Sequence, residues 1–155
     1  MPLASIEFLS SLDEIDGVLA VEHASFTNPW TKAMYVAEFE HRDVSRILLA
    51  RDAHGTTIGF CSFWRVLDEL HINNLAVTPE ERHAGVASSL LERVLDDAAA
   101  TGARRVLLEV RRSNEAALRL YGRFGFHVTS VRRGYYSQPD EDALVLTRVR
   151  PADHS

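Results

Sequence analysis

A turn between an apolar segment and an amphipathic segment is the part of the chain best suited to hold an anion. This turn carries Pro79, Arg82 and Gly85, and apolar side chains recur at helical spacing from Val86 onward. The first turn of a helix has N–H groups without intrahelical partners and lies at the positive end of the helix dipole. Small residues also let the backbone approach a phosphate closely. We therefore expect a phosphate to be held by consecutive backbone N–H groups, those of His83, Ala84, Gly85, Val86, Ala87 and Ser88.

The spacing of this turn excludes two common phosphate motifs. Residues 82–87 read Arg-x-x-Gly-x-Ala. They lack the Gly-x-Gly-x-x-Gly of dinucleotide-binding turns and the Gly-Lys-Ser/Thr of the P-loop. The turn therefore points to an anion other than a dinucleotide or a nucleoside triphosphate.

Glu109 is the candidate general base. It lies near the end of the mostly apolar run 104–111, where a solitary carboxylate is unusual. We expect partial burial to raise its pKa and make it a better proton acceptor, acting directly or through a water. The alternative is a structural salt bridge to Arg104, Arg111 or Arg112.

Tyr121 is the candidate general acid. It follows Asn114 and Ala117 at helical spacing, so it lies two turns, about 10 Å, from Asn114 along one helix face. Because this helix follows the strand that carries Glu109, we expect both side chains to line one cleft. The alternatives are a half-buried core tyrosine and, for Asn114, an ordinary residue at the start of a helix.

Composition indicates one globular domain, expected over residues 1–150 with a frayed tail at 151–155. The net charge of −5 argues against general nucleic-acid binding. Cys61 is the single cysteine, which excludes an internal disulfide, and we expect it to be a buried small hydrophobe. The sequence shows no leader peptide and no apolar run of membrane-spanning length, so we expect a reducing cytoplasm and no membrane partner. No His, Cys or carboxylate cluster has metal-ligand spacing, so we expect no metal.

Hydrophobic periodicity and turn residues predict a mixed α/β sheet in the order β-α-α-β-β-β-α-β-α-β-β. The expected strands are 6–9, 46–51, 57–66, 69–77, 104–111, 126–131 and 143–149. The expected helices are about 12–22, 31–41, 86–101 and 114–124, the second with Met34, Ala37 and Phe39 partly buried. The polar segment 132–142 is expected to be a loop.

Together these motifs resemble the GNAT superfamily of N-acetyltransferases, and within it the ribosomal-protein-alanine (RimI-like) branch. The turn at 82–87 resembles the pyrophosphate loop of that superfamily, and further similar blocks follow one another at 24–30, 68–72, 108–114, 117–121, 125–126 and 133–136. One departure is His83-Ala84, where the family frequently has glycine. If the turn needs a positive φ at either position, a non-glycine residue there is conformationally unfavourable. The resemblance implies the α/β (α+β) GNAT fold. This is a mixed, mostly antiparallel sheet of about seven strands with about four helices, splayed between the fourth and fifth strands.

The activity that the resemblance implies is acetyl transfer from acetyl-CoA to an amine. RimI-like enzymes use a glutamate and a tyrosine at the positions of Glu109 and Tyr121. The backbone of Leu75, Ala76 and Val77 is expected to pair with the pantetheine arm as an extra strand would, and Asn114 to contact the cofactor. The candidates for the acceptor site, weaker than these, are Trp30, Trp64, Glu69, His71, Tyr135 and Tyr136. Of these, Glu69 is expected to hold the acceptor ammonium, and Trp30 and the two tyrosines to lie in loops.

The expected acceptor is the N-terminal alanine of a small-subunit ribosomal protein. An α-amine titrates about 2.5 units below a lysine side chain, so its deprotonation at neutral pH costs roughly 3.4 kcal/mol less. Cys61 has no evident base beside it, which favours direct attack in a ternary complex over an acetyl-cysteine. The rival hypotheses are a GNAT enzyme for a small amine or a lysine, and a non-catalytic acyl-CoA-binding module. The oligomeric state is left open.

Overall fold

The computed structural model describes residues 2–26, 29–82, 85–137 and 139–150. Its helices are α1 (Ile15–Ser25), α2 (Lys32–Glu40), α3 (Val86–Ala100) and α4 (Glu115–Arg123). Its strands are β1 (Leu3–Phe8), β2 (Ser45–Asp52), β3 (Thr57–Val66), β4 (Glu69–Val77), β5 (Arg105–Arg111), β6 (His127–Tyr136) and β7 (Glu141–Val149). The predicted order of elements is confirmed, and β3 and β4 have the predicted bounds.

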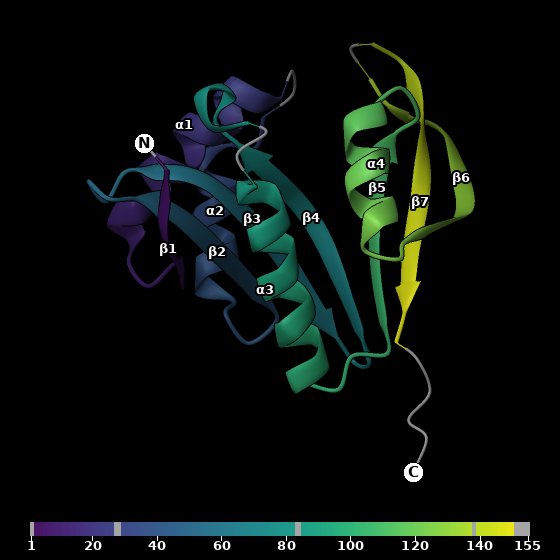
Figure 1. The fold of residues 1–155 in the computed structure, drawn as a ribbon, viewed down its shortest axis with the longest axis horizontal. Coiled ribbons are helices and arrows are strands. Elements are labelled where there is room, and N and C mark those ends of the chain that lie inside the picture. The colour runs from purple at the N-terminus through teal and green to yellow at the C-terminus, as the bar shows by residue number, and fades with distance from the viewer. Residues whose placement is uncertain (1, 27–28, 83–84, 138, 151–155) are drawn as a thin grey trace.

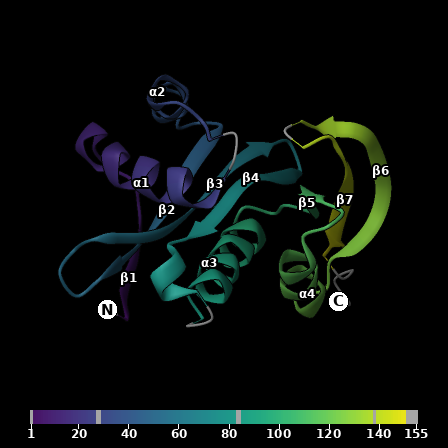
Figure 2. The same cartoon turned by 90° about the horizontal axis from the view of Figure 1, so that it is seen from above.

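The strands form one sheet in the order β1-β2-β3-β4-β5-β7-β6 (Figure 1). Every neighbouring pair is antiparallel except β4 and β5. Figure 2 shows α1 and α2 on one face of the sheet, with α3 and α4 on the other. The mixed, mostly antiparallel α/β sheet predicted from the sequence is therefore confirmed.

Helix α3 is held against the sheet by an apolar stripe and by one glycine. Its buried side chains recur at helical spacing and are Val86, Leu90, Leu91, Val94, Leu95 and Ala98. A Cβ on Gly59 in β3 would lie 3.0 Å from the carbonyl oxygen of Ala76 and 3.3 Å from a methyl group of Val86. The glycine therefore lets α3 approach β3 and β4 closely, which fixes the start of α3 beside the end of β4.

The sheet opens between β4 and β5. Their parallel pairing joins residues 69–72 to residues 105–108 and then stops, although both strands continue. On its other side β4 carries a bulge, because Ile72 and Asn74 pair with adjacent residues of β3 and leave Asn73 between them. A bulge bends its strand and increases the local twist. The predicted splay between the fourth and fifth strands is thus present, and it begins at the bulge.

Two predictions about the elements were wrong. Strand β6 continues through segment 132–136, which was expected to be a loop, because its pairing with β7 resumes at Tyr136. The interruption contains Gly134 at a φ of +62°, and its N–H donates to Asp142 at 2.9 Å. In α2, Met34 and Ala37 are exposed rather than partly buried, and Tyr35 is the buried side chain.

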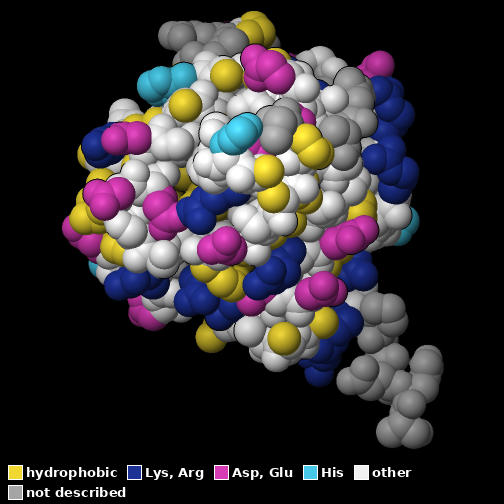
Figure 3. Space-filling model, turned by 60° about the vertical axis from the view of Figure 1, so that its left-hand side comes forward, with side chains coloured by type: hydrophobic (Ala, Val, Ile, Leu, Met, Phe, Trp, Pro, Cys, Tyr) yellow, Lys and Arg dark blue, Asp and Glu magenta, His cyan; other side chains and the backbone are white. Residues whose placement is uncertain are grey.

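The surface carries both signs of charge. Acidic and basic side chains are interspersed on the face shown in Figure 3, with hydrophobic side chains scattered between them. None of the described helices is long and apolar enough to cross a membrane.

Candidate active site

The predicted anion turn ends in a residue with a left-handed backbone conformation, which favours glycine. Gly85, the residue before α3, has a φ of +83°. No side chain of the described residues caps the helix, so the N–H groups at its first turn keep their capacity to bind an anion. Arg82 braces the turn, because its Nε lies 3.3 Å from the carbonyl oxygen of Val77 and its Nη2 lies 3.5 Å from Ser25 Oγ. His83 and Ala84 lie outside the described residues.

The end of β4 has one edge without a strand partner in the described part of the sheet. Leu75, Ala76 and Val77 pair with β3, whereas the pairing with β5 ends at Ile72. The backbone groups that face β5 beyond this point can therefore accept an extended molecule as an additional strand. This open edge runs toward the uncapped start of α3, which is the arrangement that an extended arm ending in a pyrophosphate requires.

Glu109 lies where β5 separates from β4. Its side chain is 15% exposed, with Oε2 2.8 Å from His71 Nε2 and Oε1 3.3 Å from Arg132 Nη1. The hydrogen bond from His71 is the largest influence on Glu109 and lowers its pKa, although burial acts in the opposite direction. Burial acts in the expected direction, but the expected net rise of this pKa was wrong because the hydrogen bond from His71 outweighs burial. In the described contacts the carboxylate pairs with Arg132 and His71. It pairs with none of Arg104, Arg111 and Arg112, the partners considered from the sequence.

His71 connects the bulge of β4 to Glu109. Its Nδ1 lies 2.9 Å from Asn73 Oδ1, so both ring nitrogens face oxygen atoms that accept hydrogen bonds. The hydrogen bond to Glu109 raises the pKa of His71, which favours the charged imidazolium. The hydrogen bond therefore favours the charged forms of both side chains, and a proton taken up here belongs to the pair rather than to one side chain.

Tyr121 lies on the opposite face of the sheet from Glu109. It packs among core residues under α4 with its ring 5.3 Å from that of Phe126, and it is 6% exposed. Burial raises its pKa well above the usual value, so the phenol stays protonated over the working pH range. Its hydroxyl makes no hydrogen bond to the described residues. That both side chains line one cleft therefore stays a prediction, and such a cleft would have to pass between β4 and β5 beyond the point where their pairing ends.

Tyr136 interacts electrostatically with both Glu109 and Tyr121. Burial raises the pKa of Tyr136 to about 12, and the nearby Glu109 adds to that rise. Tyr136 in turn contributes to the raised pKa of Tyr121. The guanidinium of Arg111 stacks on the Tyr136 ring at 4.4 Å, and that of Arg132 stacks on Tyr135 at 4.2 Å. The two tyrosines belong to the end of β6, not to a loop as expected, and Tyr135 is the exposed member.

The other predicted residues are not all brought to Glu109. Trp30 precedes α2 and stacks on Tyr35 at 5.2 Å between ring centres. Glu69 is the first residue of β4 and lies four residues, roughly 13 Å along the strand, before Asn73. Its carboxylate pairs with Arg105. Asn114 caps α4 by accepting a hydrogen bond from the Ala117 N–H at 3.1 Å, which is the ordinary helix-start role weighed from the sequence.

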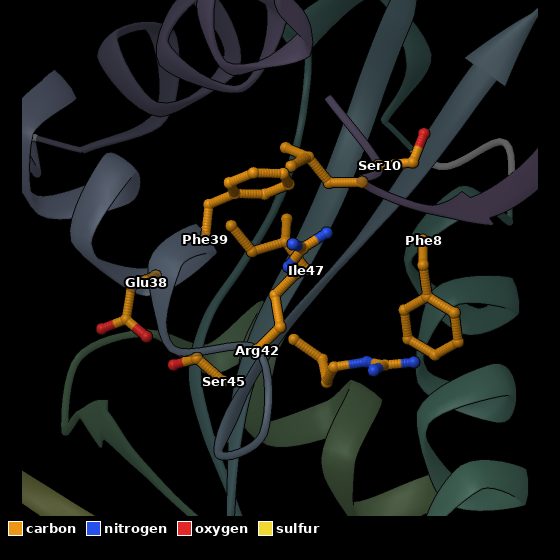
Figure 4. A pocket seen from close by; sticks show the side chains of 9 residues that line it. Phe8, Ser10, Glu38, Phe39, Arg42, Ser45 and Ile47 are labelled. Atoms are coloured by element: carbon orange, nitrogen blue, oxygen red, sulfur yellow. The ribbon is translucent and has the colours of Figure 1, made fainter. Parts of the chain in front are cut away.

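Three further features limit the possible chemistry. Cys61 is fully buried, and burial raises the pKa of its thiol, so it is a core residue as predicted and a poor nucleophile. Within the described ranges, no group of three or more His, Cys, Asp or Glu side chains could hold a metal ion. A pocket of about 170 Å³, lined by Phe8, Glu38, Phe39 and Arg42 among others, contains none of the predicted site residues (Figure 4).

Sequence reasoning missed Arg132 and Asn73. Arg132 was placed in an expected loop, and only the pairing of β6 with β7 carries its guanidinium to Glu109. Asn73 Nδ2 is buried without a partner in the described residues, which the sequence does not reveal. The sequence placed His71 in a strand beside other polar residues, but it did not predict that Glu109 would be its partner.

Known proteins share this fold and much of this sequence. The model of the acetyltransferase (GNAT) family matches residues 15–126. A relative from Bacillus subtilis (strain 168) is 36% identical over 136 residues, which cover 87% of this chain and 89% of that protein. A relative from Escherichia coli (strain K12), named ribosomal protein bS18-alanine N-acetyltransferase, is 32% identical over 142 residues, which cover 89% and 94% of the two chains.

A solved structure agrees with the sequence comparisons. The crystal structure of the ribosomal-protein-S18-alanine N-acetyltransferase from Escherichia coli matches with a TM-score of 0.86 and 28% identity, and the match covers 96% of each chain. The resemblance predicted from the sequence motifs is confirmed. The chain belongs to the acetyltransferase (GNAT) family and is an acyltransferase.

Proposed function

We propose that the protein transfers an acetyl group from acetyl-CoA to the N-terminal α-amine of a protein. The acceptor is an alanine, and the acceptor protein is a small-subunit ribosomal protein, as the names of the relatives suggest. The observation that carries the proposal is the Glu109 carboxylate, held by His71 at the point where β4 leaves β5. That position lies beside the open edge of β4, where an acyl-pantetheine arm fits as an extra strand.

The residues of the cofactor side suit coenzyme A. The uncapped first turn of α3 after Gly85 supplies N–H groups for the pyrophosphate, and residues 75–77 supply the strand edge. The side-chain nitrogen of Asn114 has no hydrogen-bond partner among the described residues and can donate to the cofactor, whereas the oxygen caps α4. Acetyl-CoA is therefore the cosubstrate in this proposal, and no metal takes part.

Glu109 acts as the general base and Tyr121 as the general acid. The Oε1 atom of Glu109, which Arg132 contacts in the free protein, is the atom that receives the proton of the attacking amine. Burial raises the pKa of Tyr121, so its hydroxyl stays protonated and is available as a hydrogen-bond donor when negative charge develops on the leaving sulfur. Trp30, Tyr135 and Tyr136 border the acceptor side.

The lowered pKa of Glu109 favours an α-amine over a lysine. A carboxylate stabilised by His71 and Arg132 is a weak base. An α-amine of pKa about 7.7–8.0 needs little help to lose a proton, whereas a lysine of pKa about 10.4 costs roughly 3.4 kcal/mol more at neutral pH. The electrostatics of the site therefore support an N-terminal acceptor.

Mass spectrometry of a designed peptide tests the proposal. The peptide begins with a free alanine and contains one internal lysine, and fragmentation locates any acetyl group added from acetyl-CoA. Acetylation of the α-amine is the expected result. Acetylation of lysine alone would indicate a lysine acetyltransferase, and transfer only to small amines would indicate the small-molecule alternative. Binding of coenzyme A with no transfer to any amine would indicate a non-catalytic acyl-CoA-binding module.

A further inference from the structure

Glu22 is a buried carboxylate that the proposed acid–base chemistry does not use. It lies near the end of α1 and is 1% exposed. No lysine, arginine or histidine of the described residues pairs with it, and burial raises its pKa. A carboxyl group in the core is costly unless hydrogen bonds compensate for the lost water. The residues that form hydrogen bonds with Glu22 therefore indicate its role.

The hydrogen bonds of Glu22 come from three other parts of the chain. The Tyr35 hydroxyl of α2 donates to Oε1, and Asn74 Nδ2 of β4 donates to the same oxygen at 3.0 Å. Asn74 Nδ2 also lies 2.9 Å from the Tyr35 hydroxyl oxygen. The backbone N–H of Trp30 donates to the carboxylate as well. One carboxyl group thus joins α1, α2, the segment before α2 and the central strand.

Asn74 is the first residue of β4 after the bulge. The bulge leaves Asn73 without a partner in β3, and pairing with β5 has already ended at Ile72. Ser62 Oγ, opposite Asn74, and Asn73 Nδ2 are both buried without partners in the described residues. Because neither of these groups fastens the bulge, the bond between Asn74 and Glu22 is the side-chain link that ties this point of the strand to the helices.

We propose that Glu22 is a positioning residue for acetyl transfer. With Tyr35 and Asn74, it fixes the bulge of β4 on the cofactor side and the Trp30 segment on the acceptor side in one arrangement. The inference rests on the acetyl transfer proposed above, because only a two-substrate reaction at the splay needs both sides held in register. A misplacement of about 1 Å far from the reacting atoms can cost roughly a hundredfold in rate.

Glu22→Gln tests this role while changing the side-chain shape little. We expect kcat to fall at least about tenfold, with the dissociation constant of coenzyme A changed by less than about threefold, because the anion turn before α3 is not part of the network. Asp52→Asn is the matched control. Asp52 is also buried and accepts backbone hydrogen bonds, from His54 and Thr56, but it lies at the end of β2, before the turn to β3. This variant should keep kcat.

Trp30 fluorescence gives a readout that is independent of the acceptor. Trp64→Phe leaves Trp30 as the single tryptophan of the chain. In that background, Glu22→Gln should increase acrylamide quenching of Trp30, since the backbone bond and the stacking on Tyr35 are loosened. If Glu22→Gln does not fold, Asn74→Ser breaks the same link from the strand side and should show the same two changes.

The outcomes separate the two proposals. A folded Glu22→Gln protein with the wild-type kcat, or with unchanged Trp30 quenching, would overturn the positioning role. A fall in kcat that merely tracks a loss of folded protein or of coenzyme A binding would overturn it too. If the wild-type protein acetylates no α-amine, the proposed function fails, whereas the Trp30 measurement still decides the role of Glu22.

Discussion

Replacement of Glu109 by glutamine is the perturbation that bears most directly on the proposed mechanism. The change keeps the shape of the side chain but removes the negative charge shared by His71 and Arg132. General-base catalysis contributes about 10²–10⁴-fold in rate. We expect the low end of this range, a fall in kcat/KM of about 10²–10³-fold at pH 7, because the lowered pKa of Glu109 makes it a weak base.

The size of this defect should depend on pH in a calculable way. An α-amine of pKa about 7.7–8.0 is roughly 10–17% neutral at pH 7 and more than about 90% neutral at pH 9. The amine thus needs the base less as the pH rises, and the defect of Glu109→Gln should shrink about five- to tenfold between these two values. Thiol release from acetyl-CoA in the presence of an alanine-initiated peptide measures the rate at each pH.

Glu69→Gln is the matched control for this experiment. Glu69 lies on β4, is paired with Arg105, and is remote from Glu109 along the strand. Its replacement should leave kcat/KM within about twofold, whereas a large defect would return Glu69 to the acceptor site. An unchanged rate in Glu109→Gln would remove Glu109 from the mechanism. A defect that is the same at every pH would show that it positions the amine without taking its proton.

Three further results are expected. Tyr121→Phe should slow turnover about tenfold or more with nearly unchanged melting temperature and coenzyme A affinity, because the hydroxyl makes no hydrogen bond to the described residues; loss of binding in calorimetry would make it a cofactor contact instead. Gly85→Ala should destabilise the fold by about 1–2 kcal/mol, since its φ is +83°, and should weaken coenzyme A binding. Gly55→Ala, at a φ of +80°, should cost similar stability and leave binding intact, and equal binding loss in both would contradict the anion turn. His71→Gln should lower the melting temperature most between about pH 4.5 and 6.5. The raised pKa of His71 contributes stability that is lost as the pH rises through the folded-state pKa of His71. The lowered pKa of Glu109 contributes stability that is lost as the pH falls through the folded-state pKa of Glu109. A difference in melting temperature between the two proteins that does not depend on pH would refute the ion pair.

Local sequence signals predicted the strand and the turn that are expected to hold the cofactor. The turn before α3 depends on Gly85 and on the apolar stripe from Val86, and both are properties of consecutive residues. Strand β4 reads clearly because its apolar residues end at a proline. The extension of β6 was missed because its pairing with β7 overrides the turn residues of segment 132–136.

The environment of Glu109 could not be predicted because its partners come from other strands. The sequence identified an isolated carboxylate on β5 and its partial burial, but the sign of the pKa shift depends on His71, which is 38 residues away. The parallel register that sets Leu107 opposite His71 is a tertiary property. Glu22 did give a local signal, since it lies at helical spacing with the buried Ile15 and Val18. A carboxylate on the buried face of a helix needs buried partners, and Asn74 and Tyr35 supply them.

The two proposed acid–base groups lie on opposite faces of one sheet, and this constrains where the reaction can occur. Leu108 and Val110 point into the core under α3 and α4 with Tyr121, so Glu109 between them must point to the other face. In a continuous sheet the two groups would be separated by backbone. The ladder between β4 and β5 ends at Ile72 and Leu108, so the proposed mechanism places the thioester beyond this point, between the two faces. In the proposed reaction the amine approaches from the Glu109 face and the thiolate departs toward Tyr121, so the proposed roles need no movement of either side chain across the sheet.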